Sequence, residues 1–241
     1  MVGPEAKHRD GPHRRPTRFT AVLFDLDGTL VDTSADIATG VNATLAEHGF
    51  GPLPIGTVLE HVGRGVRVLM QSCFEQECRV SPDDVGGVDR VVSEFRRNYA
   101  AHLLDTTRPY PGIREMIERL HAAGIAMAVV SNKPEDLSRG ILEGLRLDYR
   151  FVAILGGDTL PSRKPDPAPL LHALERIGPP RAAAPAMVGD SEIDIAAARA
   201  AAIPVAAVAW GFGSQDRLAR AAPDHLAHDP ADLESWLTGP S

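Results

Sequence analysis

The sequence predicts an α/β protein with a doubly wound parallel sheet and an inserted α-helical cap domain. From residue 109 onward, short apolar runs alternate with segments whose apolar residues recur every three or four positions. This is the rhythm of strands and helices in alternation. One further apolar run, Ala21-Val22-Leu23-Phe24, stands far upstream, and the stretch that follows it has helical periodicity but no strand-like run. The upstream run is therefore a strand of the same sheet, and the helical stretch is an insertion.

The domain limits follow from this pattern. Residues 1–18 are rich in Pro, Gly, His and Arg and have no apolar periodicity, so we interpret them as a disordered arm. Arg14-Arg15 is not a twin-arginine signal, because no hydrophobic signal core follows it. We expect a core domain made of residues 19–32 and 109–241, and a helical cap domain made of residues 33–108.

Four helices are expected in the cap domain. In the first, Ser34 caps a segment in which Ile37, Val41 and Leu45 recur every four residues, and Gly49 ends it. The other three are expected after Pro54, from Val66 to Phe74, and from Ser81-Pro82 through Tyr99.

The core domain is expected to continue with alternating helices and strands. Strands are predicted at residues 125–130, 151–155, 186–188 and 203–209. Helices are predicted around Ile117, Ile141, Leu174 and the alanine-rich segment after Asp194, with two short helices around Leu218 and Trp236. Because short loops join these units, the strands run parallel and the helices cover both faces of the sheet.

Composition limits the classes of function. The hydrophobic fraction of 44% suits a packed globular protein, and the net charge of −7 gives no basic footprint for nucleic acid or an anionic membrane. No apolar stretch approaches the roughly 20 residues that span a bilayer. The only cysteines, Cys73 and Cys78, form neither a disulfide framework nor a four-cysteine zinc site. We expect a cytoplasmic protein.

The first strand ends in a pair of carboxylates. Asp25 and Asp27 would point to opposite faces of a continuing strand, but Gly28 permits a change of direction, so both can face the crevice beyond the strand end. Two carboxylates about 4 Å apart repel by roughly 4 kcal/mol at an effective dielectric constant of about 20, so the pair shares a proton or holds a cation. A solvated turn is the alternative. An EF-hand loop is excluded, because Thr29 and Leu30 break its pattern.

Other strands also end in polar residues. Ser131 and Asn132 follow one strand, Asp190 and Asp194 follow another, and Lys164 lies in a proline-flanked loop that can reach the same edge. Each has a simpler explanation, as a helix cap, a solvated lysine or acids that complement a helix dipole. Their joint occurrence at strand ends favours one shared site.

These residues resemble a known set of motifs. Four ordered motifs of the haloacid dehalogenase superfamily are similar to Asp25-x-Asp27-Gly28-Thr29-Leu30, Ser131-Asn132, Lys164-Pro165 and Gly189-Asp190-x₃-Asp194. Bacterial phosphoglycolate phosphatases of that superfamily share features similar to Ser131-Asn132-Lys133-Pro134, Gly156-Gly157-Asp158 and Lys164-Pro165-Asp166-Pro167. The resemblance extends from Phe19 to the C-terminus and implies a Rossmann-like core with a helical cap.

The resemblance implies roles for the site residues. Asp25 would be the nucleophile, Asp27 the acid and base, and Lys164 the third catalytic residue. Mg²⁺ would be the cofactor, held by Asp25, Asp190 and the backbone carbonyl of Asp27, with Asp194 in its outer shell. The residues expected to bind substrate are Ser131, Asn132, Gly28 and Thr29, with Arg64 and Arg67 as candidates for a second anionic group.

The resemblance implies a phosphatase for a small phosphorylated metabolite, with 2-phosphoglycolate first. Alternatives are a phosphatase for a sugar phosphate such as an amino-sugar acid 6-phosphate, a phosphosugar mutase, and a non-catalytic phosphate binder, which would not need Asp27. A solvated helix start is an equal alternative for the two arginines. We expect a monomer or homodimer that binds neither nucleic acid nor membrane.

Overall fold

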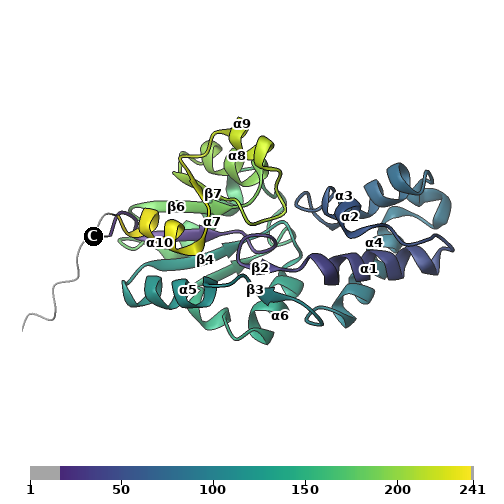
Figure 1. Ribbon diagram of the computed structural model, residues 1–241, viewed down its shortest axis with the longest axis horizontal. Coiled ribbons are helices and arrows are strands. Elements are labelled where there is room, and N and C mark those ends of the chain that lie inside the picture. Colours follow the sequence, from purple (N-terminus) through teal and green to yellow (C-terminus); the bar gives the residue numbers. More distant parts are fainter. Residues whose placement is uncertain (1–16, 240–241) are drawn as a thin grey trace, which may run out of the picture.

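The structure, a computed structural model, describes residues 17–239, so the predicted disordered arm lies almost entirely outside the described residues. A six-stranded parallel sheet forms one end of the molecule, and a group of helices extends from it (Figure 1). The strand order is β5-β4-β1-β6-β7-β8. The strands are β1 (Ala21–Phe24), β4 (Ala126–Val130), β5 (Ala153–Leu155), β6 (Pro185–Gly189), β7 (Val205–Val208) and β8 (His225–Ala227).

The strand β1 lies inside the sheet, between β4 and β6, and all its residues are apolar. Ala21 pairs with Ala126 of β4 on one side and with Pro185 of β6 on the other. Every residue of β1 is buried. The carboxyl ends of these three strands therefore lie side by side, which places the residues that follow them at one edge of the sheet.

Helices cover both faces of the sheet, as predicted. Those helices are α5 (Ile113–Ala122), α6 (Glu135–Gly144), α7 (Ala168–Ile177), α8 (Glu192–Ala200), α9 (Gln215–Ala221) and α10 (Pro230–Thr238). Side chains of α5, α6 and α10 share one hydrophobic cluster with the sheet, and those of α7, α8 and α9 share the other. This two-sided packing confirms the predicted doubly wound parallel fold.

The remaining helices form a separate helical unit, residues 34–101. Its elements are α1 (Ser34–Glu47), α2 (Ile55–Leu59), α3 (Val66–Ser72), a π-helical turn (Cys73–Glu77), a 3₁₀ turn (Pro82–Val85) and α4 (Val88–Ala101). The unit has its own hydrophobic cluster, built mainly from α1, α3 and α4. Among the described helices, none combines the length and the apolar character that a bilayer span requires.

Two predictions about helix starts were wrong. Ser81-Pro82 begins only the 3₁₀ turn, and α4 begins at Val88, because Gly86 and Gly87 adopt φ angles of 111° and 92° that interrupt the helix. At the start of α1, Thr33 occupies the N-cap position instead of Ser34. The Thr33 hydroxyl donates to Asp27 Oδ1 at 2.7 Å and does not cap the helix.

A tie joins the two places where the chain crosses between the sheet and the helical unit. The short strand β2 (Val31–Asp32) pairs antiparallel with β3 (Arg108–Pro109). Beside this pair, the buried Asp36 carboxylate accepts hydrogen bonds from the backbone N–H and the hydroxyl of both Thr106 and Thr107, at 2.5–3.0 Å. We call these hydrogen bonds and the β2–β3 pair the crossing tie. The sequence analysis identified neither the tie nor the strand β8.

Candidate active site

Asp25 directly follows the central strand, and its position is fixed by the sheet. Its backbone N–H donates to Val188 O at 2.9 Å, and its Oδ1 accepts from Leu26 N at 2.7 Å. The side chain is almost fully buried. Burial raises the pKa of Asp25 to about 6, although the nearby Lys164 ammonium opposes the rise. The carboxylate therefore lies in an environment that disfavours an uncompensated negative charge.

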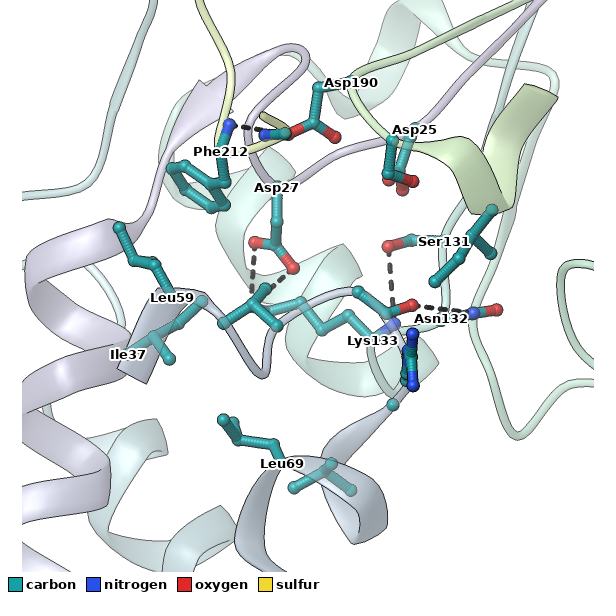
Figure 2. Close-up of a pocket in the computed structure, with 18 of the residues that line it drawn as sticks. Asp25, Asp27, Ile37, Leu59, Leu69, Ser131, Asn132, Lys133, Asp190 and Phe212 are labelled. Atoms are coloured by element: carbon teal, nitrogen blue, oxygen red, sulfur yellow. Dashed lines mark hydrogen bonds and ion pairs between the residues drawn. The ribbon is translucent and has the colours of Figure 1, made fainter. Parts of the chain in front are cut away.

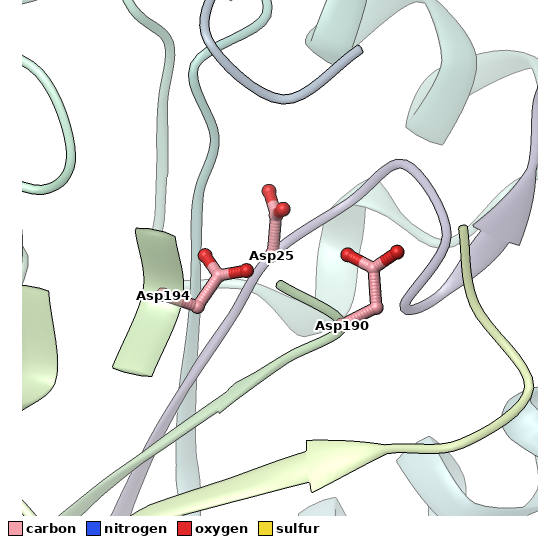
Figure 3. Close-up of side chains that lie close together, drawn as sticks. All are labelled: Asp25, Asp190 and Asp194. Atoms are coloured by element: carbon pink, nitrogen blue, oxygen red, sulfur yellow. The ribbon is translucent and has the colours of Figure 1, made fainter. Parts of the chain in front are cut away.

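Three buried carboxylates converge at this edge of the sheet. Asp25 follows β1, Asp190 follows β6, and Asp194 lies in the first turn of α8 (Figure 3). One oxygen from each lies within 4.8 Å of the others. Burial raises the pKa of Asp190 well above its usual range, and the charges of Asp194 and Asp25 add to the rise. The cluster carries more negative charge than its environment stabilises.

Lys164 is the positive group within this cluster. Its Nζ lies 3.0 Å from Asp25 Oδ1 and 2.6 Å from Asp194 Oδ1. Burial lowers the pKa of Lys164, but the two carboxylates raise it above its ordinary value, so the ammonium stays charged. The other oxygen of Asp194 accepts from Ser191 N and Oγ in a capping box at the start of α8. Asp194 thus holds Lys164 against Asp25.

Asp190 is fixed by a backbone N–H from one distant loop and a side-chain hydroxyl from another. Phe212 N donates to its Oδ2 at 2.7 Å, and Thr29 Oγ1 approaches its Oδ1 at 3.5 Å. Gly28 packs so closely that a Cβ there would overlap Asp190 Oδ2, and a Cβ on Gly211 would overlap Asp190 Cβ. Gly28 also has φ +77°, which an L side chain rarely adopts. The glycine of the first motif therefore makes room for Asp190.

The Asp27 side chain points into the pocket beside this cluster (Figure 2). Lys133 Nζ lies 2.9 and 3.1 Å from its two oxygens, and Thr33 supplies a third hydrogen bond. The ammonium of Lys133 also lies over the ring of Tyr99 from α4, 4.4 Å from the centroid. Burial lowers the pKa of Lys133, but the Asp27 charge and Tyr99 raise it above its ordinary value. The sequence analysis named Lys133 within the Ser131-Asn132-Lys133-Pro134 motif but gave it no role of its own.

Ser131 and Asn132 line the same pocket. Ser131 Oγ accepts from Lys133 N at 3.3 Å, which leaves its own hydrogen free to donate. The Asn132 side chain bridges two segments, because its Nδ2 donates to Gly63 O at 2.9 Å and to Lys164 O at 2.8 Å. Among the described residues, the Asn132 backbone N–H has no hydrogen-bond partner. The side chain therefore organises the site, and the backbone N–H is the group that remains available.

The other residues predicted to bind substrate are distributed differently. Gly28 and Thr29 lie behind Asp190 and do not line the pocket. Arg64 lines the pocket from the loop before α3. Arg67 is absent from the pocket lining, and its guanidinium pairs with Asp89 on the surface at 2.7 Å. The structure thus brings only one of the two arginines to the site.

The pocket lies between the carboxyl edge of the sheet and the helical unit. Its polar floor comes from the sheet edge, and much of its wall is apolar. The apolar side chains include Ile37, Leu59, Val62, Val66, Leu69, Phe95, Leu137 and Ile193. Arg217 of α9 also lines it, 3.8 Å from Glu192. A bound molecule would contact both parts of the chain.

The donor set at the floor fits a hard divalent cation. The converging groups are carboxylate oxygens, the ligands that Mg²⁺ and Ca²⁺ prefer. Their burial leaves an excess of negative charge that Lys164 alone does not neutralise. The Asp27 carboxylate is not part of this cluster of oxygens, because it faces Lys133 and Thr33. The residues present therefore fit a metal ion between Asp25 and Asp190.

The fold and the site together define an enzyme with a doubly wound core and an acidic centre at the edge of its sheet. This chain belongs to the haloacid dehalogenase-like hydrolase family, whose model matches residues 22–208.

Known relatives cover most of the chain. The phosphoglycolate phosphatase of Xanthomonas campestris pv. campestris is 40% identical over 215 residues, which are 88% of this chain and 94% of that protein. The phosphoglycolate phosphatase of Aquifex aeolicus is 37% identical over 214 residues, 88% of this chain and 93% of its own. The crystal structure of a predicted phosphoglycolate phosphatase from Haemophilus somnus is similar with a TM-score of 0.81 and 31% identity, over 90% of this chain and 97% of that chain.

Proposed function

We propose that this chain is a Mg²⁺-dependent phosphatase that hydrolyses a small phosphate monoester, with 2-phosphoglycolate as the first candidate. The observation that carries the proposal is the meeting of Asp25, Asp190 and Asp194 in one buried cluster with the Lys164 ammonium, at the floor of a pocket. The relatives named phosphoglycolate phosphatase, about 40% identical over most of the chain, support the choice of substrate.

In the first half-reaction, an Asp25 carboxylate oxygen attacks the phosphorus in line. A bond forms between that oxygen and phosphorus, and the bond from phosphorus to the ester oxygen breaks. Asp27 donates a proton to the departing alkoxide, which leaves as the alcohol. The product on the protein is an aspartyl-phosphate at Asp25.

In the second half-reaction, water attacks the same phosphorus. Asp27, now a carboxylate, accepts the proton of that water. The bond between phosphorus and Asp25 breaks, inorganic phosphate leaves, and both carboxyl groups return to their starting states. Thr33 and Lys133 hold Asp27 in the pocket for both proton transfers.

The remaining residues stabilise charge and position the phosphoryl group. Asp25, Asp190 and the backbone carbonyl of Asp27 would hold Mg²⁺, which when bound offsets the repulsion between the nucleophile and the phosphoryl oxygens. The Lys164 ammonium, held by Asp194, offsets the same repulsion between Asp25 and the phosphoryl oxygens. The Ser131 hydroxyl and the Asn132 backbone N–H are the donors for the phosphoryl oxygens.

We propose that residues 33–108 act as a cap domain over this site. The pocket wall from the helical unit excludes bulk water when a small substrate binds, which strengthens the electrostatic contacts inside. The crossing tie holds both connections of this unit together. A small ester suits such an enclosed site better than a phosphoprotein does.

A phosphatase screen with inorganic phosphate as the readout tests the proposal. The panel holds 2-phosphoglycolate, an amino-sugar acid 6-phosphate and para-nitrophenyl phosphate, with Asp25→Asn as the control for contaminating activity. We expect fastest turnover of 2-phosphoglycolate. Hydrolysis of the sugar phosphate alone would reassign the substrate, transfer of phosphate to a sugar hydroxyl would indicate a mutase, and no turnover of any compound would indicate a binding protein.

A further inference from the structure

The proposed function leaves one buried cation of the pocket without a role toward the substrate. Arg64 is exposed, and Arg217 lies near Glu192. The Lys133 side chain is only 6% exposed, yet it lines the pocket. A buried ammonium is costly unless it is paired, and here its partner is Asp27, the residue beside which the leaving group would lie.

The geometry of Lys133 leaves part of its hydrogen-bonding capacity unused. An ammonium has three donors, and the two contacts to Asp27 use two of them. On another side the ammonium faces the Tyr99 ring. The third donor is therefore on the side of Tyr99, within reach of a group that enters the pocket next to Asp27.

Tyr99 supplies a second unused polar group at the same place. Its side chain is 1% exposed and lines the pocket, and among residues 17–239 its hydroxyl has no hydrogen-bond partner. The ring is held by stacking on Phe95 and by the close approach of Gly40, where a Cβ would lie 2.8 Å from Tyr99 Cβ. A buried, unpaired hydroxyl costs stability, so an acceptor that enters the pocket here gains a hydrogen bond from it.

We propose that Lys133 and the Tyr99 hydroxyl form the subsite for a carboxylate on the leaving group, one carbon away from the ester oxygen. This inference rests on the proposed function, in which Asp27 lies within hydrogen-bond reach of that ester oxygen. In an α-carboxylate ester, only two bonds separate the ester oxygen from the carboxyl carbon. A group that contacts both oxygens of Asp27 is therefore within reach of the carboxylate, and Lys133 is that group.

The subsite gives the pocket its selectivity for anionic leaving groups. The ammonium pairs with the carboxylate, and the phenol donates a second hydrogen bond from the cap side. When the leaving group has no carboxylate, the Lys133 ammonium and the Tyr99 hydroxyl lose this buried partner, so such a substrate binds and reacts less well. Arg64 and Arg67, the candidates from the sequence, are not needed for this recognition.

The test compares two substrates that differ only in the charged group. We measure kcat/KM for 2-phosphoglycolate and for 2-hydroxyethyl phosphate, in the wild type, Lys133→Met and Tyr99→Phe. The ratio of the two values cancels any general effect on Asp27 or on folding. We expect Lys133→Met to lower this ratio about ten- to hundredfold, and Tyr99→Phe to lower it several-fold. Tyr149→Phe is the matched control, because Tyr149 is exposed and does not line the pocket; we expect its ratio to equal that of the wild type.

A second readout separates the subsite from the proposed function. The two compounds are tested as inhibitors of para-nitrophenyl phosphate hydrolysis, which needs no turnover of either. If the wild type hydrolyses 2-phosphoglycolate well and both variants keep its preference, the proposed function stands and the subsite is refuted. If the wild type does not hydrolyse it but is inhibited by it in a manner that depends on Lys133 and Tyr99, the subsite stands and the substrate is wrong. If the wild type prefers 2-phosphoglycolate over 2-hydroxyethyl phosphate neither as a substrate nor as an inhibitor, the proposed substrate and the subsite are both refuted.

Discussion

Replacing Asp36 by asparagine should destabilise the protein strongly, although Asp36 lies outside the pocket. The carboxylate is 1% exposed and accepts from four donors of Thr106 and Thr107. An asparagine offers one acceptor oxygen, and its NH₂ group would face N–H and hydroxyl donors. Two hydrogen bonds to a charged acceptor are then lost, and at about 1.5–3 kcal/mol each the loss sums to roughly 3–6 kcal/mol.

The same substitution has a defined dependence on pH. Burial raises the pKa of Asp36, but the hydrogen bonds from Thr106 and Thr107 outweigh it, so the pKa lies below its ordinary value. A lowered pKa contributes stability above the pKa of the unfolded chain, and this stability is lost as the pH falls through the folded pKa. The difference between wild type and Asp36→Asn should therefore be constant from neutral pH to about pH 5 and shrink below about pH 4.

Urea unfolding followed by far-UV circular dichroism measures this difference. The matched control is Asp105→Asn, because Asp105 is an exposed neighbour whose side chain pairs with His102; we expect it to change the free energy of unfolding by less than about 0.5 kcal/mol. Faster amide exchange at Thr106 and Thr107 in the variant would place the loss at the crossing tie. A loss below about 1 kcal/mol, or one that is the same near pH 7 and near pH 3.5, would refute the reasoning.

Three further predictions concern the site itself. Asp25→Asn should reduce phosphate release by at least about a thousandfold with an unchanged circular dichroism spectrum, because the amide is isosteric but not nucleophilic; activity within tenfold of the wild type would remove Asp25 from its role. Chelation should abolish activity, Mg²⁺ should restore it and Ca²⁺ should not, because calcium takes more ligands at longer distances; full activity after metal analysis shows no ion would contradict the metal assignment. Gly28→Ala should raise the Mg²⁺ concentration needed for half-maximal activity, because its Cβ displaces Asp190. Gly56→Ala, which meets no atom within 4 Å, is the control and should not raise it.

The grouping of polar residues at the sheet edge was predictable from the sequence, because it follows from a general property of parallel sheets. Parallel strands end at one edge, so the polar residues after three apolar runs had to lie near one another, and the structure places Asp25, Ser131 and Asp190 together. Lys164 was also expected there, and it lies within 3.0 Å of Asp25.

Contacts between distant helices and loops could not be predicted in this way. Tyr99 was identified only as an apolar position of a helix, since its neighbour Lys133 comes from another part of the chain. Arg67 was a candidate because it lies near a glycine-rich loop, but the direction of α3 points it toward Asp89. The break before α4 depended on the φ angles of Gly86 and Gly87, which a sequence pattern does not reveal.

The packing around Asp190 has a consequence for how the acidic centre assembles. Gly28, Gly211 and Gly213 surround this residue so closely that a Cβ on any of them would overlap it, and Phe212 N holds its carboxylate. The fold itself, rather than a bound ion, therefore selects the rotamer of Asp190. Ion binding then freezes no further rotation of this side chain, which lowers its entropic cost.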